Sequence, residues 1–408
     1  MKSKTIIILL LSVLCAVAMP LHAQKKVLNQ ARDYIKSGQN LEKAESLLRE
    51  QLKDSARRCD TKIWEMLVES ITAQYDKGNE SLYLKQKYDT LALFSTTRKL
   101  FSVMESMDSV DARPDEDGIV DLKFRQKHAR YLRSIMPNLF YGGVFLVNKQ
   151  KYDDAYEYFD HFISLPKLPL YSVLNIDSTS KMMVSAAYWT MYCGFKLNSP
   201  SMIMKHRELA RRDTSQLAFV FQYEAVAQKL SHDTASYVRT LHEGFAKYPK
   251  FPYFFPCLEE YYNSTEQYDS ALAIADRALA IDSANDVYRY AKSTALLNSG
   301  HYKECIAICK DLLAKNADFA DANYNAGLAY FNMAVALDKV RQASRSKRRT
   351  MTGYYREALP YLEKYRTLAP DAEANWLSPL YTIYLNLNMG EKFDEIDKLR
   401  HEYKRNHK

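Results

Sequence analysis

The sequence contains little glycine and little proline. Of its 408 residues, only 11 are Gly and 12 are Pro. Turn-rich β architectures and long disordered segments use these residues heavily, because glycine adopts unusual backbone angles and proline interrupts regular structure. The composition therefore argues against both kinds of structure.

The cysteines do not form a disulfide pattern. Cys15 lies in an apolar run near the N-terminus, and the other five are irregularly spaced: Cys59, Cys193, Cys257, Cys305 and Cys309. A disulfide framework uses an even number of cysteines in a small domain. Cys305 and Cys309 are one helical turn apart, and we interpret them as apolar packing residues, with a redox or metal-binding pair as the alternative.

Sequence motifs of catalysis are absent as well. There is no glycine-rich phosphate loop, no nucleophile elbow and no His-Glu-x-x-His pair that would place two imidazoles on one helical face. The nine histidines are scattered singly. We therefore predict a protein that is not an enzyme and uses no cofactor or metal. The alternative is a hydrolase whose site is assembled from distant parts of the chain.

The chain has one long apolar run, between residues 5 and 18. Two lysines precede it, and small residues follow at Ala18 and Ala23. This order is typical of a secretory signal peptide, and the run is too short for a transmembrane helix. We predict a signal peptide over residues 1–23, cleaved after Ala18 or Ala23, and export to the periplasm or outer membrane. The alternative is an uncleaved anchor.

The formal net charge is +8, from 57 basic and 49 acidic residues. In an exported protein, a mild basic excess argues against nucleic acid as the natural target. It leaves acidic proteins and anionic membrane lipids as candidate partners.

The second half of the sequence repeats at a fixed interval. Tyr237, Ala271 and Cys305 are equivalent positions spaced 34 residues apart, and Ala358 follows after 53 residues, which is 34 plus an insertion of 19. A period of 34 is typical of a helix-turn-helix unit that cannot bury its apolar face alone. We therefore expect helix pairs that stack on one another.

Several residues fit a known repeat pattern. Gly327 and Tyr330 match its first helix, and Ala358, Leu362 and Pro370 match its second. On these residues the chain resembles the tetratricopeptide repeat family. The resemblance implies an all-α fold, an α-α superhelix of stacked antiparallel helix pairs, and small residues where two helices cross closely.

The same register extends upstream. Gly143 and Ala155 are 12 residues apart, which is the spacing of the resembled family. We therefore expect divergent repeats over residues 24–135 and a solenoid over 136–408. The insertion predicts an extended helical hairpin at about 332–357.

An acidic run with Pro and Gly, Asp108 to Gly118, predicts a surface loop. Gly118 at the sixth position of a calcium loop would put Arg113 first and Phe124 twelfth, where oxygen ligands are required. We therefore interpret the run as a solvated loop and not as a calcium site.

Binding is expected on the face lined by first helices, which is concave in a superhelix of stacked pairs. Tyr and Asn suit a groove for an extended peptide, because they combine rigid amphipathic surface with amides that bond a backbone. The alternative is that they pack against the adjacent repeat. Mapped by register, the candidates are Phe140, Asn148, Tyr188, Tyr192, Tyr290, Asn298, Tyr324, Phe331 and Asn332.

A second candidate surface is a basic cluster at the tip of the expected hairpin. It comprises Lys339, Arg341, Arg345, Lys347, Arg348 and Arg349. It predicts either a solubilising hairpin end or docking to an anionic surface, which would be membrane phosphate or an acidic partner.

Together these features predict a non-catalytic adaptor of the bacterial cell envelope that binds a protein or peptide. A glycan- or peptide-binding accessory protein at the outer membrane is the alternative. The sequence does not indicate an oligomeric state.

Overall fold

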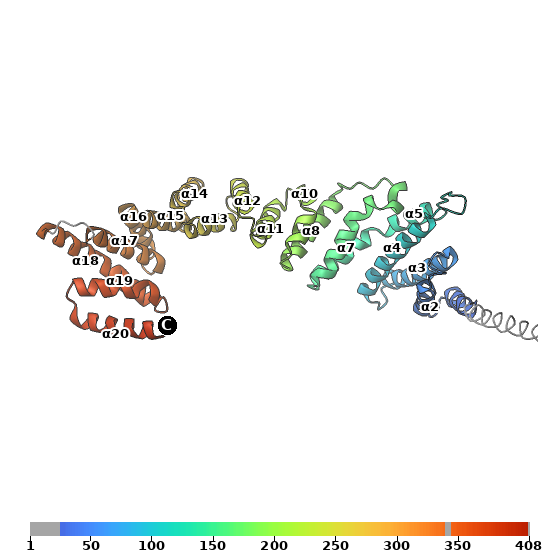
Figure 1. Cartoon of the computed structure of the whole chain (residues 1–408), viewed down its shortest axis with the longest axis horizontal. Coiled ribbons are helices and arrows are strands. Elements are labelled where there is room, and N and C mark those ends of the chain that lie inside the picture. Colours follow the sequence, from blue (N-terminus) through green and yellow to red (C-terminus); the bar gives the residue numbers. More distant parts are fainter. Residues whose placement is uncertain (1–24, 339–343, 407–408) are drawn as a thin grey trace, which may run out of the picture. The chain divides into compact units, whose positions relative to one another are not determined.

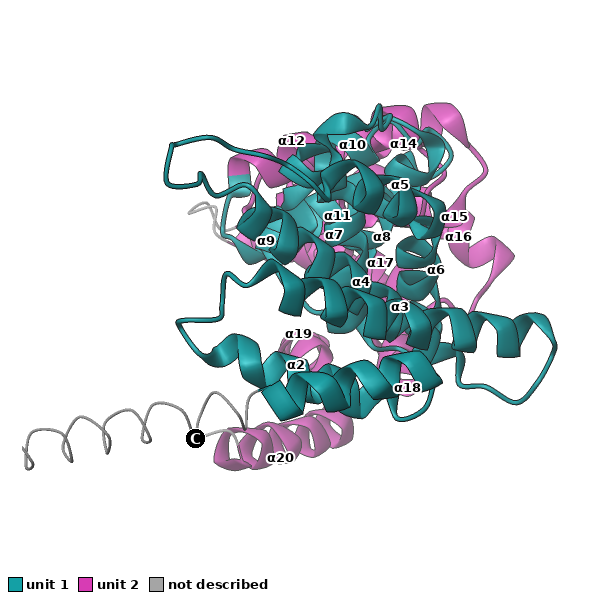
Figure 2. Ribbon diagram, turned by 90° about the vertical axis from the view of Figure 1, so that its right-hand side faces the viewer, with its two compact units in different colours: residues 1–234 teal, residues 235–408 magenta. Residues whose placement is uncertain are grey.

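The structure is a computed structural model that describes residues 25–338 and 344–406. The described residues are predominantly helical and contain no β-strand. They divide into two compact units at residue 234 (Figure 2). The predicted all-α fold is confirmed, while the signal peptide expected over 1–23 lies outside the described residues.

Unit 1 contains helices that pack against their neighbours in sequence order (Figure 1). A helix over 25–37 comes first. The following elements are α2 (Leu41–Lys53), α3 (Thr61–Tyr83), α4 (Thr90–Asp111), α5 (Arg125–Ile135), α6 (Pro137–Asn148), α7 (Tyr152–Ser164), the short 3₁₀ turns η1 (Leu165–Lys167) and η2 (Pro169–Val173), α8 (Lys181–Lys196), α9 (Pro200–Lys205), α10 (Arg207–Ala210) and α11 (Leu217–Leu230).

Unit 2 continues the alternation of first and second helices. Its elements are α12 (Thr234–Lys247), α13 (Phe254–Ser264), α14 (Tyr268–Ile281), α15 (Asp286–Asn298), α16 (Tyr302–Lys315), α17 (Ala320–Asp338), α18 (Arg345–Leu368), α19 (Glu373–Asn386) and α20 (Gly390–Asn406). The second helices α12, α14 and α16 begin 34 residues apart, as do the first helices α15 and α17. The predicted repeat of helix pairs is therefore confirmed.

Glycines allow close approach where paired helices cross. A Cβ atom on Gly143 of α6 would lie 2.6 Å from the ring of Phe159 of α7, and one on Gly327 of α17 would lie 2.7 Å from Leu362 of α18. Real Cβ contacts are longer, so a larger residue at either position would force the neighbouring side chain to shift. The structure thus gives the physical reason for two of the small residues in the repeat pattern.

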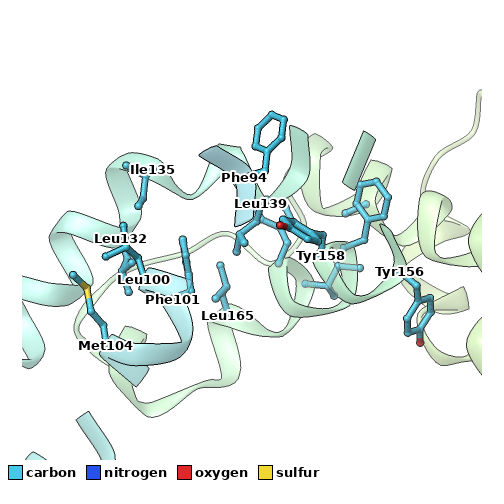
Figure 3. Packing of buried hydrophobic residues seen from close by; sticks show 14 of the residues in the cluster. Phe94, Leu100, Phe101, Met104, Leu132, Ile135, Leu139, Tyr156, Tyr158 and Leu165 are labelled. Atoms are coloured by element: carbon cyan, nitrogen blue, oxygen red, sulfur yellow. The ribbon is translucent and has the colours of Figure 1, made fainter. Parts of the chain in front are cut away.

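The core of unit 1 runs continuously from helix to helix. Figure 3 shows part of it, where α4, α5 and α6 meet. The segment after α7 belongs to this core, because Leu165, Leu170 and Tyr171 of η1 and η2 are almost fully buried. Burial of such apolar side chains stabilises each helix pair against the next, at roughly 25 cal/mol per Å² of apolar surface.

The insertion in unit 2 falls on two long helices. α17 has 19 residues and α18 has 24, whereas the preceding pair, α15 and α16, has 13 and 14. The extra residues are shared between the pair and lengthen α18 by about 15 Å. Ala358 and Leu362 on α18 are fully buried, as their place in the repeat requires.

The acidic loop is shorter than the sequence suggested. α4 continues to Asp111, and residues 112–124 connect it to α5, so placing the start of the loop at Asp108 was wrong. Asp108 is buried, and its carboxylate accepts two hydrogen bonds of 2.8 Å from the guanidinium of Arg125. This buried pair allows the acidic residue to remain within the helix.

The five cysteines in the described part of the chain form no disulfide. Cys305 and Cys309 are buried on one face of α16, and their thiols are in hydrogen-bond contact with the sulfur atoms 4.0 Å apart. They pack beside Leu296 and Ala326 in the local core. Among the helices of residues 25–338 and 344–406, none is both long and apolar enough to cross a membrane.

Candidate functional site

The first helices of unit 1 bring aromatic side chains together. Tyr188 and Tyr192, two of the residues predicted from the sequence, lie on α8 beside further rings from α7, α8 and α11. We define the aromatic patch as Tyr152, Tyr188, Trp189, Tyr192, Phe195, Phe219 and Tyr223.

The rings of the aromatic patch form one connected surface around Tyr223. The ring of Phe195 stacks on Tyr223 with centroids 4.8 Å apart, and the rings of Tyr188 and Tyr192 lie 6.1 and 6.3 Å from it. These separations are within the range of favourable aromatic pairs. Tyr223 is buried, whereas Phe219 is 41% exposed, so the patch has a fixed base and an accessible edge.

Polar atoms complete the patch. Burial raises the pKa of Tyr223 well above its usual value, and a hydrogen bond with Tyr188 acts in the same direction. Both phenols are therefore neutral at physiological pH. Lys196 holds its ammonium 5.4 Å from the ring centroid of Tyr192 and 5.8 Å from that of Phe195. Such an arrangement binds apolar or aromatic side chains and offers hydroxyl groups to a peptide backbone.

The sequence did not identify the contribution of α11. Phe219 and Tyr223 were not among the predicted residues, although they are four positions apart, the spacing that places two side chains on one helical face. Their meeting with α8 depends on tertiary packing. Only the helical spacing could have indicated them.

Other predicted groove residues pack within their own unit. Phe140 contacts the rings of Phe159 and Phe162 on the adjacent α7. The same holds in unit 2, where three candidate rings pair with neighbours at centroid distances of 5.4, 4.8 and 6.0 Å: Tyr290 with Phe319, Tyr324 with Tyr365, and Phe331 with Tyr355. Burial also raises the pKa of Tyr290 to about 12. These four side chains are half-buried, as Tyr188 and Tyr192 are, and each contacts one or two rings of a neighbouring helix.

Asparagines recur near the C-terminal ends of first helices. In unit 2 the exposed Asn298 of α15 donates a 3.2 Å hydrogen bond to Asn263 of α13. The half-buried Asn332 of α17 is the equivalent residue in the following helix pair, 34 positions later. In unit 1 the exposed Asn148 is the last residue of α6. Amide side chains of this kind can bond an extended backbone.

The basic cluster is partly described. Arg345, Arg348 and Arg349 are exposed in the first turns of α18, and Lys347 is half-buried there. Lys339 and Arg341 lie outside the described residues.

A cavity of about 380 Å³ in unit 1 is lined by Arg49, Arg98 and Lys99, among others. Each cation already has a carboxylate partner, since Arg49 and Lys99 both pair with Glu45 and Arg98 pairs with Glu157. Burial opposes ionisation of Glu45, but its hydrogen bonds with Gln74, Arg49 and Lys99 lower its pKa, so this group stays ionised and offsets part of the positive charge of the cavity wall. The cavity is thus a structural ion-pair network.

Within 25–338 and 344–406, no group of three or more His, Cys, Asp or Glu side chains is arranged to hold a metal ion. The surfaces described above are suited to binding.

Comparison with known proteins identifies the repeat. Residues 264–329, which include α15 and α16, match the family model described as tetratricopeptide repeat. This match covers part of unit 2. No curated protein matches the sequence.

Solved helical-repeat structures resemble this one at low sequence identity. The C-terminal part of a TPR repeat-containing protein from Cytophaga hutchinsonii is 12% identical, with a TM-score of 0.44 over 64% of this chain and 93% of that chain. A TPR repeats protein from Bacteroides fragilis is 15% identical, with a TM-score of 0.31 over 65% of this chain and 98% of that chain. Yeast Tom70 is 12% identical, with a TM-score of 0.31 over 87% of this chain and 96% of that chain.

Proposed function

We propose that the protein is a non-catalytic interaction scaffold of the bacterial cell envelope. It binds a protein or peptide partner on the aromatic patch of its first helices. The observation that carries this proposal is the connected ring surface of α8 and α11, with Tyr223 as its base and Phe219 at its exposed edge.

Two features support a protein or peptide as the ligand. Stacked helix pairs of the tetratricopeptide type generally mediate protein–protein interaction, and residues 264–329 match that family. Aromatic side chains provide rigid binding surface at low cost in conformational entropy, and they dominate the energetics of many interfaces. Asn298 and Asn263 add amides in unit 2 that could bond an extended backbone.

The envelope location rests on the N-terminal sequence, where two lysines, an apolar run and small residues resemble a secretory signal. We therefore place the scaffold on the periplasmic side or at the outer membrane.

Capture of the partner from an envelope extract tests the proposal. The bait is the full chain, either unchanged or with Tyr192→Ala and Phe219→Ala. A matched control, Val287→Ala with Leu385→Ala, removes two exposed apolar side chains from other first helices, α15 and α19.

We expect one stoichiometric protein to bind the unchanged chain and the control, and binding to the patch variant to weaken at least 10-fold, since truncating a central aromatic residue of an interface costs about 1–2 kcal/mol or more. Equal binding by both variants would refute the role of the patch. Retention of carbohydrate in place of protein would favour the glycan-binding alternative.

A further inference from the structure

The first three turns of α18 carry several basic residues and no acidic residue. Arg345, Lys347, Arg348, Arg349 and Arg356 lie within twelve residues, and the first acidic residue is Glu357. Nine other described helices have an acidic residue in their first turn: α2, α7, α10, α14, α15, α16, α17, α19 and α20. An acidic residue there complements the positive end of the helix dipole, whereas arginine opposes it. The basic start of α18 is therefore unfavourable for the isolated helix.

Four of these side chains form a row on one exposed face. Arg348, Arg349 and Arg356 follow Arg345 by three, four and eleven positions, which places the four on the same side of a helix, and all four are exposed. We call this set the arginine row. It extends about 16 Å along the helix axis.

The buried residues of α18 begin at Tyr355, C-terminal to three of the four arginines. Tyr355, Ala358 and Leu362 are buried in the core of unit 2, and Tyr355 contacts the ring of Phe331 on α17. Packing of α18 through these later residues leaves the four arginines exposed to solvent. Within the described residues, no salt bridge involves any of its four guanidinium groups.

The surroundings of the row favour a lipid surface over a protein. The residues around its N-terminal half are Ser344, Ser346 and Thr350, which are exposed and polar. A stable protein interface has an apolar core, which this half of the row lacks. Headgroup phosphates need no apolar counterpart, and guanidinium binds phosphate oxygens in a bidentate manner. A row about 16 Å long also covers several headgroups at once.

We propose that the arginine row docks the protein on membranes rich in anionic phospholipids, with the guanidinium groups bound to headgroup phosphates. This surface is separate from the aromatic patch. The inference relies on the envelope location proposed above and does not require the patch to bind a partner.

Binding of the purified full chain to vesicles tests this proposal. The probes are phosphatidylglycerol-rich vesicles and phosphatidylcholine vesicles. The variant carries Arg345→Gln, Arg348→Gln and Arg349→Gln. The matched control carries Lys398→Gln, Lys404→Gln and Arg405→Gln, which removes three exposed cations from α20 and leaves the same net charge.

We expect the unchanged chain to bind phosphatidylglycerol vesicles and not phosphatidylcholine vesicles. Each basic residue near an anionic surface contributes about a fivefold gain in affinity, so the variant should bind about 100-fold more weakly. The α20 control variant should lose much less affinity for these vesicles. Raising the salt concentration should weaken binding, because the attraction is screened beyond about 8 Å at physiological ionic strength.

A second variant keeps the test valid if the glutamine variant is unstable. Replacing the same three arginines with lysine retains their charge, and vesicle binding should stay within a few-fold. Equal loss in the glutamine variant and the α20 control would overturn the proposal, as would binding to soluble polyglutamate but not to vesicles.

Failure of this inference and failure of the proposed function give different results. Tyr192→Ala with Phe219→Ala should leave vesicle binding unchanged, and the glutamine variant should leave partner capture without vesicles unchanged.

Discussion

Gly143 of α6 faces Phe159 of α7 so closely that an added Cβ atom would lie 2.6 Å from the phenyl ring. Phe159 is fully buried and contacts the rings of Phe140 and Trp189, so it has little space to move. This pair sets the distance between the two helices. Gly143→Ala should therefore lower the free energy of unfolding by about 1–3 kcal/mol, as overpacking does in other cores.

Gly353→Ala is the matched control for that substitution, and urea unfolding followed by circular dichroism measures both. Gly353 lies in α18 with nothing within 4 Å of an added Cβ atom, so alanine should be neutral or stabilise the helix by up to about 1 kcal/mol. An unchanged midpoint for Gly143→Ala would contradict the close-crossing account.

His128 of α5 should make stability depend on pH. Burial lowers its pKa from 6.5 to about 4, and its Nδ1 atom has no hydrogen-bond partner. The unfolded chain binds a proton at this side chain between pH 6.5 and 4, whereas the folded chain does not. Above pH 6.5 the lowered pKa of His128 therefore has no effect on the free energy of unfolding. As the pH drops from 6.5 toward 4, the free energy of unfolding falls by about 3 kcal/mol at most.

His128→Gln measures this contribution, because glutamine has no charge at any of these pH values. Between pH 7 and pH 4 the variant should lose less free energy of unfolding than the unchanged chain, by up to about 3 kcal/mol. Equal losses would show that His128 titrates normally in the folded state.

Asp108 and Arg125 should stabilise the folded protein because their opposite charges pair where both side chains are largely buried. The side chain of Asp108 is 4% exposed and that of Arg125 is 14% exposed. Asp108→Asn leaves the buried guanidinium without the carboxylate that it binds directly and should cost about 3–5 kcal/mol. The exposed pair of Glu50 and Lys53 provides the control, and Glu50→Gln should cost less than about 1 kcal/mol. Similar losses from the two substitutions would refute the role assigned to burial.

The thiols should react at very different rates in the folded protein. Cys59 is exposed, while Cys193, Cys305 and Cys309 are buried. Burial raises the pKa of Cys193 to about 12, so the reactive thiolate is scarce there as well as inaccessible. Maleimide labelling followed by peptide mass spectrometry should modify Cys59 within minutes and the three buried thiols only in denaturant. Rapid native labelling of Cys305 or Cys309 would revive the redox-pair alternative.

The repeat was predictable because its physical cause is local. A helix pair of fixed length needs a small residue at each crossing, so Gly143, Gly327 and Ala358 recur in register with the apolar positions. The end of α4 was not predictable in the same way. Asp108 looks like a loop residue until Arg125, seventeen positions later, provides its buried partner.

The candidate site was predictable only in part. Tyr188 and Tyr192 follow from the first-helix register, but the register cannot tell which neighbouring rings each of them contacts. Tyr324 and Phe331 have the same sequence signature and contact rings of α18. Tyr223 joins the patch through contact between α8 and α11, which no local pattern specifies.

Site-specific photocrosslinking in living cells tests the central claim most directly. A benzophenone amino acid replaces either Phe219 at the edge of the aromatic patch or Ile281 at the end of the second helix α14, both of which are more than 40% exposed. We predict one discrete crosslinked protein from position 219 and none from position 281. Crosslinks of equal yield from both positions, or from 281 alone, would contradict a scaffold that binds its partner through the first-helix aromatic patch.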